Sequence, residues 1–87
     1  MQPEAIKCLI ETHLHQTSAM VEGDGAHFTA IVISPLFAGK SRLQKQQLVY
    51  DTVRKQLLDG TLHALSIQTY TPEEWQALVT SHDAGEL

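Results

Sequence analysis

The chain has 87 residues, of which 43% are hydrophobic and 18% charged, a composition typical of one small folded domain and not of a disordered chain. Its single cysteine, Cys8, excludes an intramolecular disulfide, and its longest apolar stretch, residues 30–33, is far shorter than the roughly 20 residues that a membrane helix needs. The N-terminal residues lack the basic and apolar regions of a signal peptide, so we expect a cytoplasmic protein.

The net charge of −4 is unevenly distributed along the chain. Segment 40–55 carries five basic residues and one carboxylate, whereas the rest of the chain carries one lysine and nine carboxylates. A basic segment of this kind is typical of a solvated helix face, and it is also what a docking surface for an anionic partner requires. Charge alone leaves both interpretations open.

The predicted elements begin with an amphipathic helix over residues 3–15. Pro3 suits the first turn of a helix, and apolar residues recur at helical spacing: Ile6, Leu9, Ile10 and Leu14. Two strands are predicted over 18–22 and 27–34, and the Gly-Asp-Gly turn between them favours a β-hairpin. Pro35 ends the second strand because proline lacks the donor that a sheet ladder needs, and one short turn follows it.

A long helix is predicted over 41–58, and we expect it to be the longest helix of the chain. Ser41 and Gln44 form a capping-box pattern at its start, no proline or glycine interrupts it, and Gly60 follows its end. Its apolar face, which we expect to be buried, contains Leu43, Tyr50, Val53 and Leu57.

A half-buried strand is predicted over 62–70, and a last helix follows a second capping box that begins at Thr71. We expect Trp75 to anchor this last helix in the core. Residues 81–87 are polar and are expected to form a flexible C-terminal tail, which leaves a single domain over residues 1–80.

The predicted order is helix, strand, strand, short turn, helix, strand, helix, or α-β-β-α-α-β-α when the turn is counted as a helix. The hairpin makes the first two strands antiparallel, and a right-handed crossover through the long helix makes the second and third strands parallel if they are neighbours. The sequence therefore predicts an α+β domain in which helices pack on one face of a mixed three-stranded sheet.

No catalytic motif is evident, since the sequence has no phosphate loop, no nucleophile elbow and no paired-carboxylate pattern, so we expect no enzymatic activity. We interpret Cys8 as a small, semi-buried residue of the first helix. Among the five histidines, His27 and His63 lie at the edges of predicted strands, where the backbone is held and the side chain is exposed. No Cys-x-x-Cys or closely spaced histidine pair completes a metal site, so any metal would need ligands from a second molecule.

Three stretches of the sequence resemble BolA-like proteins: 37–42 (FAGKSR), 48–50 (LVY) and 63–67 (HALSI). Three further stretches resemble the IbaG branch of that family: 23–28 (GDGAHF), 45–47 (KQQ) and 70–75 (YTPEEW). The resemblance covers about residues 3–78. It implies a fold like the type II KH domain, in agreement with the predicted order of elements.

The resemblance also implies a partner, a monothiol glutaredoxin of the Cys-Gly-Phe-Ser type, with which BolA-like proteins share a 2Fe–2S cluster. In such complexes the glutaredoxin supplies a cysteine, glutathione supplies a second thiolate and the BolA-like protein supplies histidine. The family histidine at the start of the third strand corresponds to His63, and the nearest match to a second ligand in the hairpin loop is His27. The resemblance implies no cofactor for the protein alone.

The residues that we expect to meet the partner protein or the carboxylates of glutathione are Lys40, Ser41, Arg42 and Lys45. An alternative function is DNA-binding transcriptional regulation through the basic helix 40–55, since the family has been linked to transcriptional control. Against this alternative, the chain lacks a Gly-x-x-Gly loop, has few aromatic residues and is acidic overall. A plain protein-interaction domain without a cluster is a third possibility.

Overall fold

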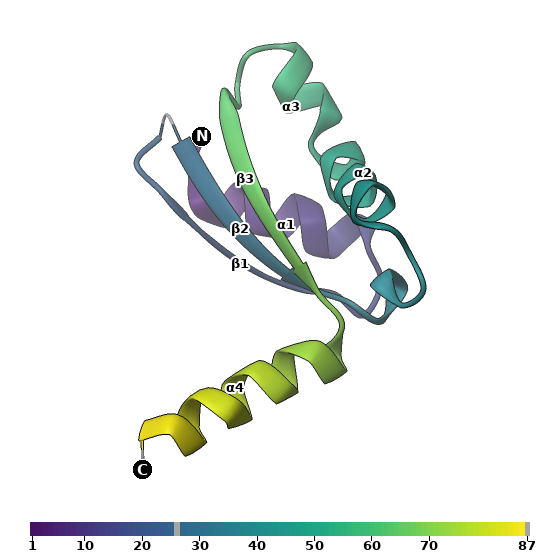
Figure 1. Cartoon of the computed structure of the whole chain (residues 1–87). Coiled ribbons are helices and arrows are strands. Elements are labelled where there is room, and N and C mark those ends of the chain that lie inside the picture. The colour runs from purple at the N-terminus through teal and green to yellow at the C-terminus, as the bar shows by residue number, and fades with distance from the viewer. Residues whose placement is uncertain (26, 87) are drawn as a thin grey trace.

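The structure is a computed structural model that describes residues 1–25 and 27–86, and for 81–86 it describes the backbone only. Figure 1 shows its elements in chain order, which are α1 (Pro3–His13), β1 (Ser18–Gly23), β2 (His27–Ile33), the 3-10 helix η1 (Pro35–Phe37), α2 (Arg42–Thr52), α3 (Arg54–Leu58), β3 (Ala64–Tyr70) and α4 (Pro72–Glu86). This order confirms the predicted α+β fold, with the expected short turn present as η1.

The three strands form one mixed sheet in the order β1-β2-β3. β1 pairs with β2 in antiparallel orientation, and β2 pairs with β3 in parallel orientation from the His27–Ala64 pair to the Ile33–Tyr70 pair. Both predicted strand orientations are therefore confirmed, and β1 and β3 form the two edges of the sheet.

The core lies between the sheet and the helices α1 and α2. Alternate residues of β2 are buried, namely Phe28, Ala30 and Val32, as the period of two of a strand requires. They join Ile6 and Ile10 of α1, Val49 of α2 and Phe37 of η1 in one apolar cluster. The local patterns that predicted these elements thus also identify most of the core.

The predicted long helix over 41–58 is wrong, because the structure divides it into α2 and α3 at Val53. At Val53 the backbone has φ −121° and ψ 15°, and its N–H donates to the Tyr50 carbonyl oxygen three residues earlier. The preceding Thr52 hydroxyl donates to the Val49 carbonyl oxygen at 2.6 Å, a local bond that competes with the helical ladder. The break leaves Val53 fully buried, so tertiary packing overrides an uninterrupted helical pattern.

The expected burial of Leu43 is also wrong, since its side chain is 67% exposed. The face of α2 that approaches β3 contains Arg42, Lys45 and Gln46. Leu43 lies beside this face and not on it, so the buried stripe of α2 begins only in its second half, at Val49.

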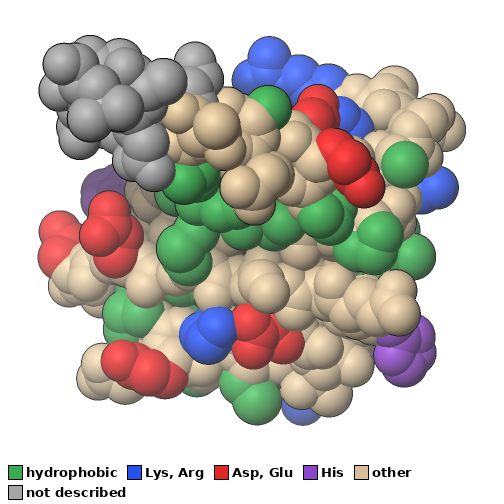
Figure 2. Space-filling view, turned by 90° about the horizontal axis from the view of Figure 1, so that it is seen from below, with side chains coloured by type: hydrophobic (Ala, Val, Ile, Leu, Met, Phe, Trp, Pro, Cys, Tyr) green, Lys and Arg blue, Asp and Glu red, His purple; other side chains and the backbone are tan. Residues whose placement is uncertain are grey.

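The last helix leaves the sheet at the end of β3 and leads away from it (Figure 1). Trp75 is half-buried and contacts the Tyr70 ring at a centroid distance of 5.4 Å, so the prediction that Trp75 belongs to the core is wrong. Leu78 and Val79 are 47% and 38% exposed, and Figure 2 shows a band of hydrophobic side chains on this side of the molecule. Helix α4 continues to Glu86, and the flexibility expected of 81–87 stays a prediction, since the side chains of 81–86 and all of Leu87 lie outside the described residues.

Two side chains of α1 bond to the outer edge of β1 at Ala19. Lys7 Nζ donates to the Ala19 carbonyl oxygen at 2.8 Å, and the Ala19 N–H donates to Glu11 Oε2 at 2.9 Å. Lys7 and Glu11 also pair with each other at 2.6 Å. The Lys7 ammonium and the Ala19 N–H together hold the pKa of Glu11 below its usual value. We call these three residues the β1 clamp.

Candidate functional site

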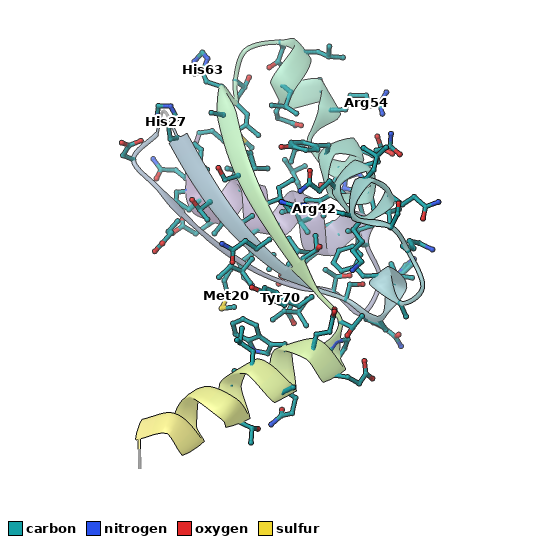
Figure 3. All side chains as sticks on the ribbon, viewed as in Figure 1. Met20, His27, Arg42, Arg54, His63 and Tyr70 are labelled. Carbon is teal, nitrogen blue, oxygen red and sulfur yellow. The ribbon has the colours of Figure 1, made fainter. Side chains whose placement is uncertain are left out.

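The parallel register of β2 and β3 brings His27 and His63 to the same end of the sheet. His27 begins β2 and is opposite Ala64, and His63 immediately precedes Ala64. Neighbouring strands lie about 4.8 Å apart, so the two histidines come from adjacent positions of the sheet end. Figure 3 shows both side chains there, and both residues are exposed. The sequence placed His63 inside the third strand, whereas the strand begins one residue later.

Local hydrogen bonds hold the backbone beneath His27. Its N–H donates to Asp24 Oδ1 at 3.0 Å, and its carbonyl oxygen accepts from the Asp24 N–H at 3.3 Å. At Gly23 a Cβ atom would meet the His27 carbonyl oxygen at 2.3 Å. Only glycine therefore fits where β1 and the start of β2 approach each other this closely. These contacts hold the backbone of His27, while its side chain stays exposed.

The loop before His63 is held in a similar way. Leu62 is buried, and its N–H donates to the Gln56 carbonyl oxygen at 3.0 Å. The Thr61 N–H donates to Asp59 Oδ1 at 2.9 Å, and the hydrogen bonds from Thr61 lower the pKa of Asp59. These contacts fix the chain direction at the start of β3 and leave the His63 side chain exposed.

The donor set at this end of the sheet is two imidazoles. Within the part of the chain that the structure describes, no group of three or more His, Cys, Asp or Glu residues has the arrangement to hold a metal ion. Cys8 is exposed on α1, which corrects its interpretation as semi-buried, and His13 lies on the same helix with its Nδ1 at 2.8 Å from the Leu9 carbonyl oxygen. Two imidazoles fit one iron of a 2Fe–2S cluster, as histidine pairs do in Rieske centres, and leave the remaining ligands to other molecules.

The predicted partner-binding residues lie on and beside α2. Arg42 and Lys45, with Gln46, form one wall of a groove of about 320 Å³, and Ile67, Gln68, Thr69 and Tyr70 of β3 form the other. Ser41 has a structural role, because its hydroxyl accepts from the Gln44 N–H at 3.2 Å and its N–H donates to Gln44 Oε1 at 2.9 Å. Lys40 precedes this cap and is exposed. The structure therefore places only Arg42 and Lys45 of the four in the groove.

The first turn of α4 lies near the groove. Glu74 closes the Thr71 capping box by accepting from the Thr71 N–H at 2.8 Å, and this bond is the main cause of its lowered pKa. The positive charge of Lys45 makes a smaller contribution to the same lowering of the Glu74 pKa.

The structure separates the histidines from the basic groove. The groove lining on β3 begins at Ile67, about 13 Å along the strand from His63 at 3.3 Å per residue. The basic groove and the two histidines are therefore separate surfaces of the molecule, and the expected contact of Arg42 and Lys45 with a partner or with glutathione stays a prediction.

Sequence reasoning missed the β3 side of the groove and the β1 clamp. The β3 wall is formed by ordinary strand residues, and its position depends on β3 being an edge strand next to α2. The i, i+4 spacing of Lys7 and Glu11 was a usable signal for their ion pair, but not for the bonds of both side chains to Ala19.

No helix within the described residues is long and apolar enough to cross a membrane. Comparison with known proteins finds that residues 1–74 match the BolA-like protein family. The chain is 40% identical over 75 residues to the acid stress protein IbaG of Escherichia coli K12, covering 86% of this chain and 89% of that relative.

The chain is also 32% identical over 77 residues to the DNA-binding transcriptional regulator BolA of the same organism, covering 88% of this chain and 70% of BolA. A solved structure of a BolA homologue from Coxiella burnetii superposes with a TM-score of 0.79 at 39% identity, covering 87% of this chain and 97% of that one. The match to IbaG confirms the resemblance of the sequence to that branch. By its sequence and its fold, the chain belongs to the BolA-like protein family.

Proposed function

We propose that this protein is a non-enzymatic adaptor that shares a 2Fe–2S cluster with a monothiol glutaredoxin, in iron–sulfur cluster trafficking or iron sensing. The observation that supports it is the pair of exposed imidazoles, His27 and His63, on adjacent strands at one end of the sheet. The partner named in the proposal, a glutaredoxin of the Cys-Gly-Phe-Ser type, is the one that the family resemblance implies.

The chemistry of the donor set fits a shared cluster better than a resident one. A 2Fe–2S cluster takes four protein or thiol ligands, and this end of the sheet offers two. The glutaredoxin cysteine and the glutathione thiolate would supply the other two. Imidazole in place of thiolate removes negative charge from the cluster and raises its reduction potential. A cluster shared with this chain would therefore have a higher reduction potential than one held by thiolates alone. His63 is the primary ligand of the proposal, and His27 is the second.

The test is a titration of the protein into a cluster-loaded monothiol glutaredoxin with glutathione, followed by visible absorption and by electron paramagnetic resonance after reduction. The wild-type protein should change both spectra. The His63→Ala variant should keep its fold and give a different spectrum, because one iron loses a nitrogen ligand. His27→Ala should give a similar or smaller change.

His13→Ala is the matched control, because His13 is an exposed histidine on α1 and not at the sheet end. It should give the wild-type spectra. Spectra of the His63→Ala complex that equal those of the wild type would remove the ligand role and with it the cluster-sharing proposal.

DNA binding is the second candidate function, favoured by the placement of Arg42 and Lys45 in one groove and by the similarity to BolA, a relative named as a DNA-binding transcriptional regulator. Duplex DNA should then bind with an affinity that falls steeply with salt, and Arg42→Ala should weaken binding and reduce the salt slope by about one. An affinity that does not change with salt would count against this candidate.

A further inference from the structure

The groove beside α2 exposes the outer edge of β3. Four consecutive residues, 67–70, line it, although successive side chains of a strand point to opposite faces of the sheet. What these four residues share is their backbone, so the groove is lined by the edge of the strand and not by one of its faces. β3 is the last strand of the three-stranded sheet, so no strand among residues 1–25 and 27–86 lies beyond it.

Hydrogen bonds at the two ends of β3 fix which backbone groups face outward. The Tyr70 carbonyl oxygen accepts from the Ser34 N–H at 2.9 Å, so it points toward β2. The Leu65 carbonyl oxygen accepts from the Tyr50 hydroxyl of α2 at 3.0 Å, so it points away from β2. Backbone groups of a strand alternate in direction from residue to residue. The N–H and C=O groups of Ile67 and Thr69 therefore point into the groove.

The opposite wall of the groove is cationic. Arg42 is exposed and Lys45 is half-buried, and the two ion pairs found among the described side chains, Lys7–Glu11 and Arg54–Asp51, lie elsewhere. A ligand in this groove would thus meet backbone donors and acceptors on one side and two positive charges on the other.

We propose that this groove binds an extended acidic peptide segment of a partner protein as a fourth strand on β3. The peptide backbone would pair with Ile67 and Thr69, and its carboxylates would lie against Arg42 and Lys45. A nucleic acid fits less well, because its sugar–phosphate backbone has no N–H donors to complete a ladder with β3. The proposal extends the partner-binding role of Arg42 and Lys45 and is independent of a cluster at the histidines.

The experiment uses the full chain and a fluorescein-labelled ten-residue peptide of alternating Glu and Val, without glutaredoxin or iron, so its failure would leave the cluster proposal intact. Binding is measured by fluorescence anisotropy, and amide exchange is measured by NMR. The peptide should bind and slow exchange at Ile67 and Thr69 at least tenfold, with little change at Gln68, whose N–H already faces β2.

Charge reversal tests the cationic wall. The double variant R42E/K45E should weaken peptide binding at least tenfold. The control R54E/K55E makes the same change in net charge on α3, outside the groove, and should change binding less than twofold. A peptide with N-methyl groups on alternate residues tests the backbone ladder without altering the protein. When the methyl groups replace the N–H groups that would pair with β3, the peptide should bind at least tenfold more weakly.

Three results would overturn the proposal. The first is peptide binding that leaves exchange at Ile67 and Thr69 unchanged. The second is equal weakening by R42E/K45E and R54E/K55E, which would reduce the effect to net charge. The third is salt-sensitive binding of a 20-base-pair duplex, lost in R42E/K45E, by a protein that does not bind the peptide, which would assign the groove to nucleic acid.

Discussion

The side chain of Glu11 connects helix α1 to the outer edge of strand β1. Its carboxylate accepts from both the Lys7 ammonium and the Ala19 N–H. Glu11→Gln keeps an acceptor for Ala19 and removes the charge that Lys7 pairs with, so we expect a loss of about 1 kcal/mol in the free energy of unfolding at pH 7.

The destabilisation caused by Glu11→Gln should become smaller as the pH falls. The folded-state pKa of Glu11 is lowered, so the charged group stabilises the fold above its ordinary pKa of 4.5, and this stabilisation is lost as pH falls through the folded pKa. Urea unfolding of wild type and Glu11→Gln between pH 7 and pH 3 should show the difference shrinking below about pH 4.5. Glu22→Gln changes the same charge on β1 away from the clamp, and its difference from wild type should not follow this profile.

Gly39 is a second residue with a testable local role, because its φ is +74° at the junction between η1 and the Ser41 cap. A Cβ atom there would have no neighbour within 4 Å, so a substitution strains only the backbone. Gly39→Ala should destabilise the fold by about 1–2 kcal/mol in urea unfolding. A semisynthetic protein with D-alanine at this position should recover the loss, whereas equal destabilisation by both enantiomers would show that backbone handedness is not the cause.

At the level of elements, α4 is held to the sheet by little apolar contact. The Thr71–Glu74 capping box and the Tyr70–Trp75 ring contact define its start, and its described side chains contribute nothing to the buried core. We therefore expect Trp75→Ala to cost about 1 kcal/mol. Phe37→Ala removes a fully buried ring and should cost about 3–5 kcal/mol. Equal losses for the two variants in urea unfolding would place Trp75 in the core after all.

The sequence predicted those elements whose signals are local. Alternation in β2, the capping boxes at Ser41 and Thr71, and Pro35 at a strand end depend on near neighbours, and all lie where they were expected. The break at Val53 and the exposure of Leu43 depend on how α2 meets β3, and no pattern within the helix reports that contact.

The candidate site was predictable only in parts. His27 and His63 were identified as exposed residues at strand edges, but their proximity depends on the parallel register of β2 and β3. Arg42 and Lys45 stood out by charge, whereas the strand edge that faces them depends on the order of the strands. Residue type is visible in a sequence, and the relative placement of distant segments is not.

For the whole molecule, the arrangement of ligands predicts how the protein behaves without a partner. Two imidazoles at one sheet end do not complete a metal site, and the other described residues offer no group of three ligands. The protein purified alone should therefore be colourless between 350 and 700 nm (about the visible range) and should contain far less than one equivalent of iron or zinc by mass spectrometry. A stoichiometric, tightly held metal in the isolated protein would contradict the cluster-sharing proposal.

The two edges of the sheet differ, and this difference limits how copies of the chain can associate. The clamp of Lys7 and Glu11 occupies both backbone groups of Ala19 on the β1 side, while Ile67 and Thr69 stay open on the β3 side. Stacking of strands into a fibril needs two open edges on every molecule, because each copy must receive a neighbour on both sides. The clamp interrupts the β1 edge at Ala19, one of the six residues of β1, so a second copy should pair more readily with the β3 edge than with the β1 edge.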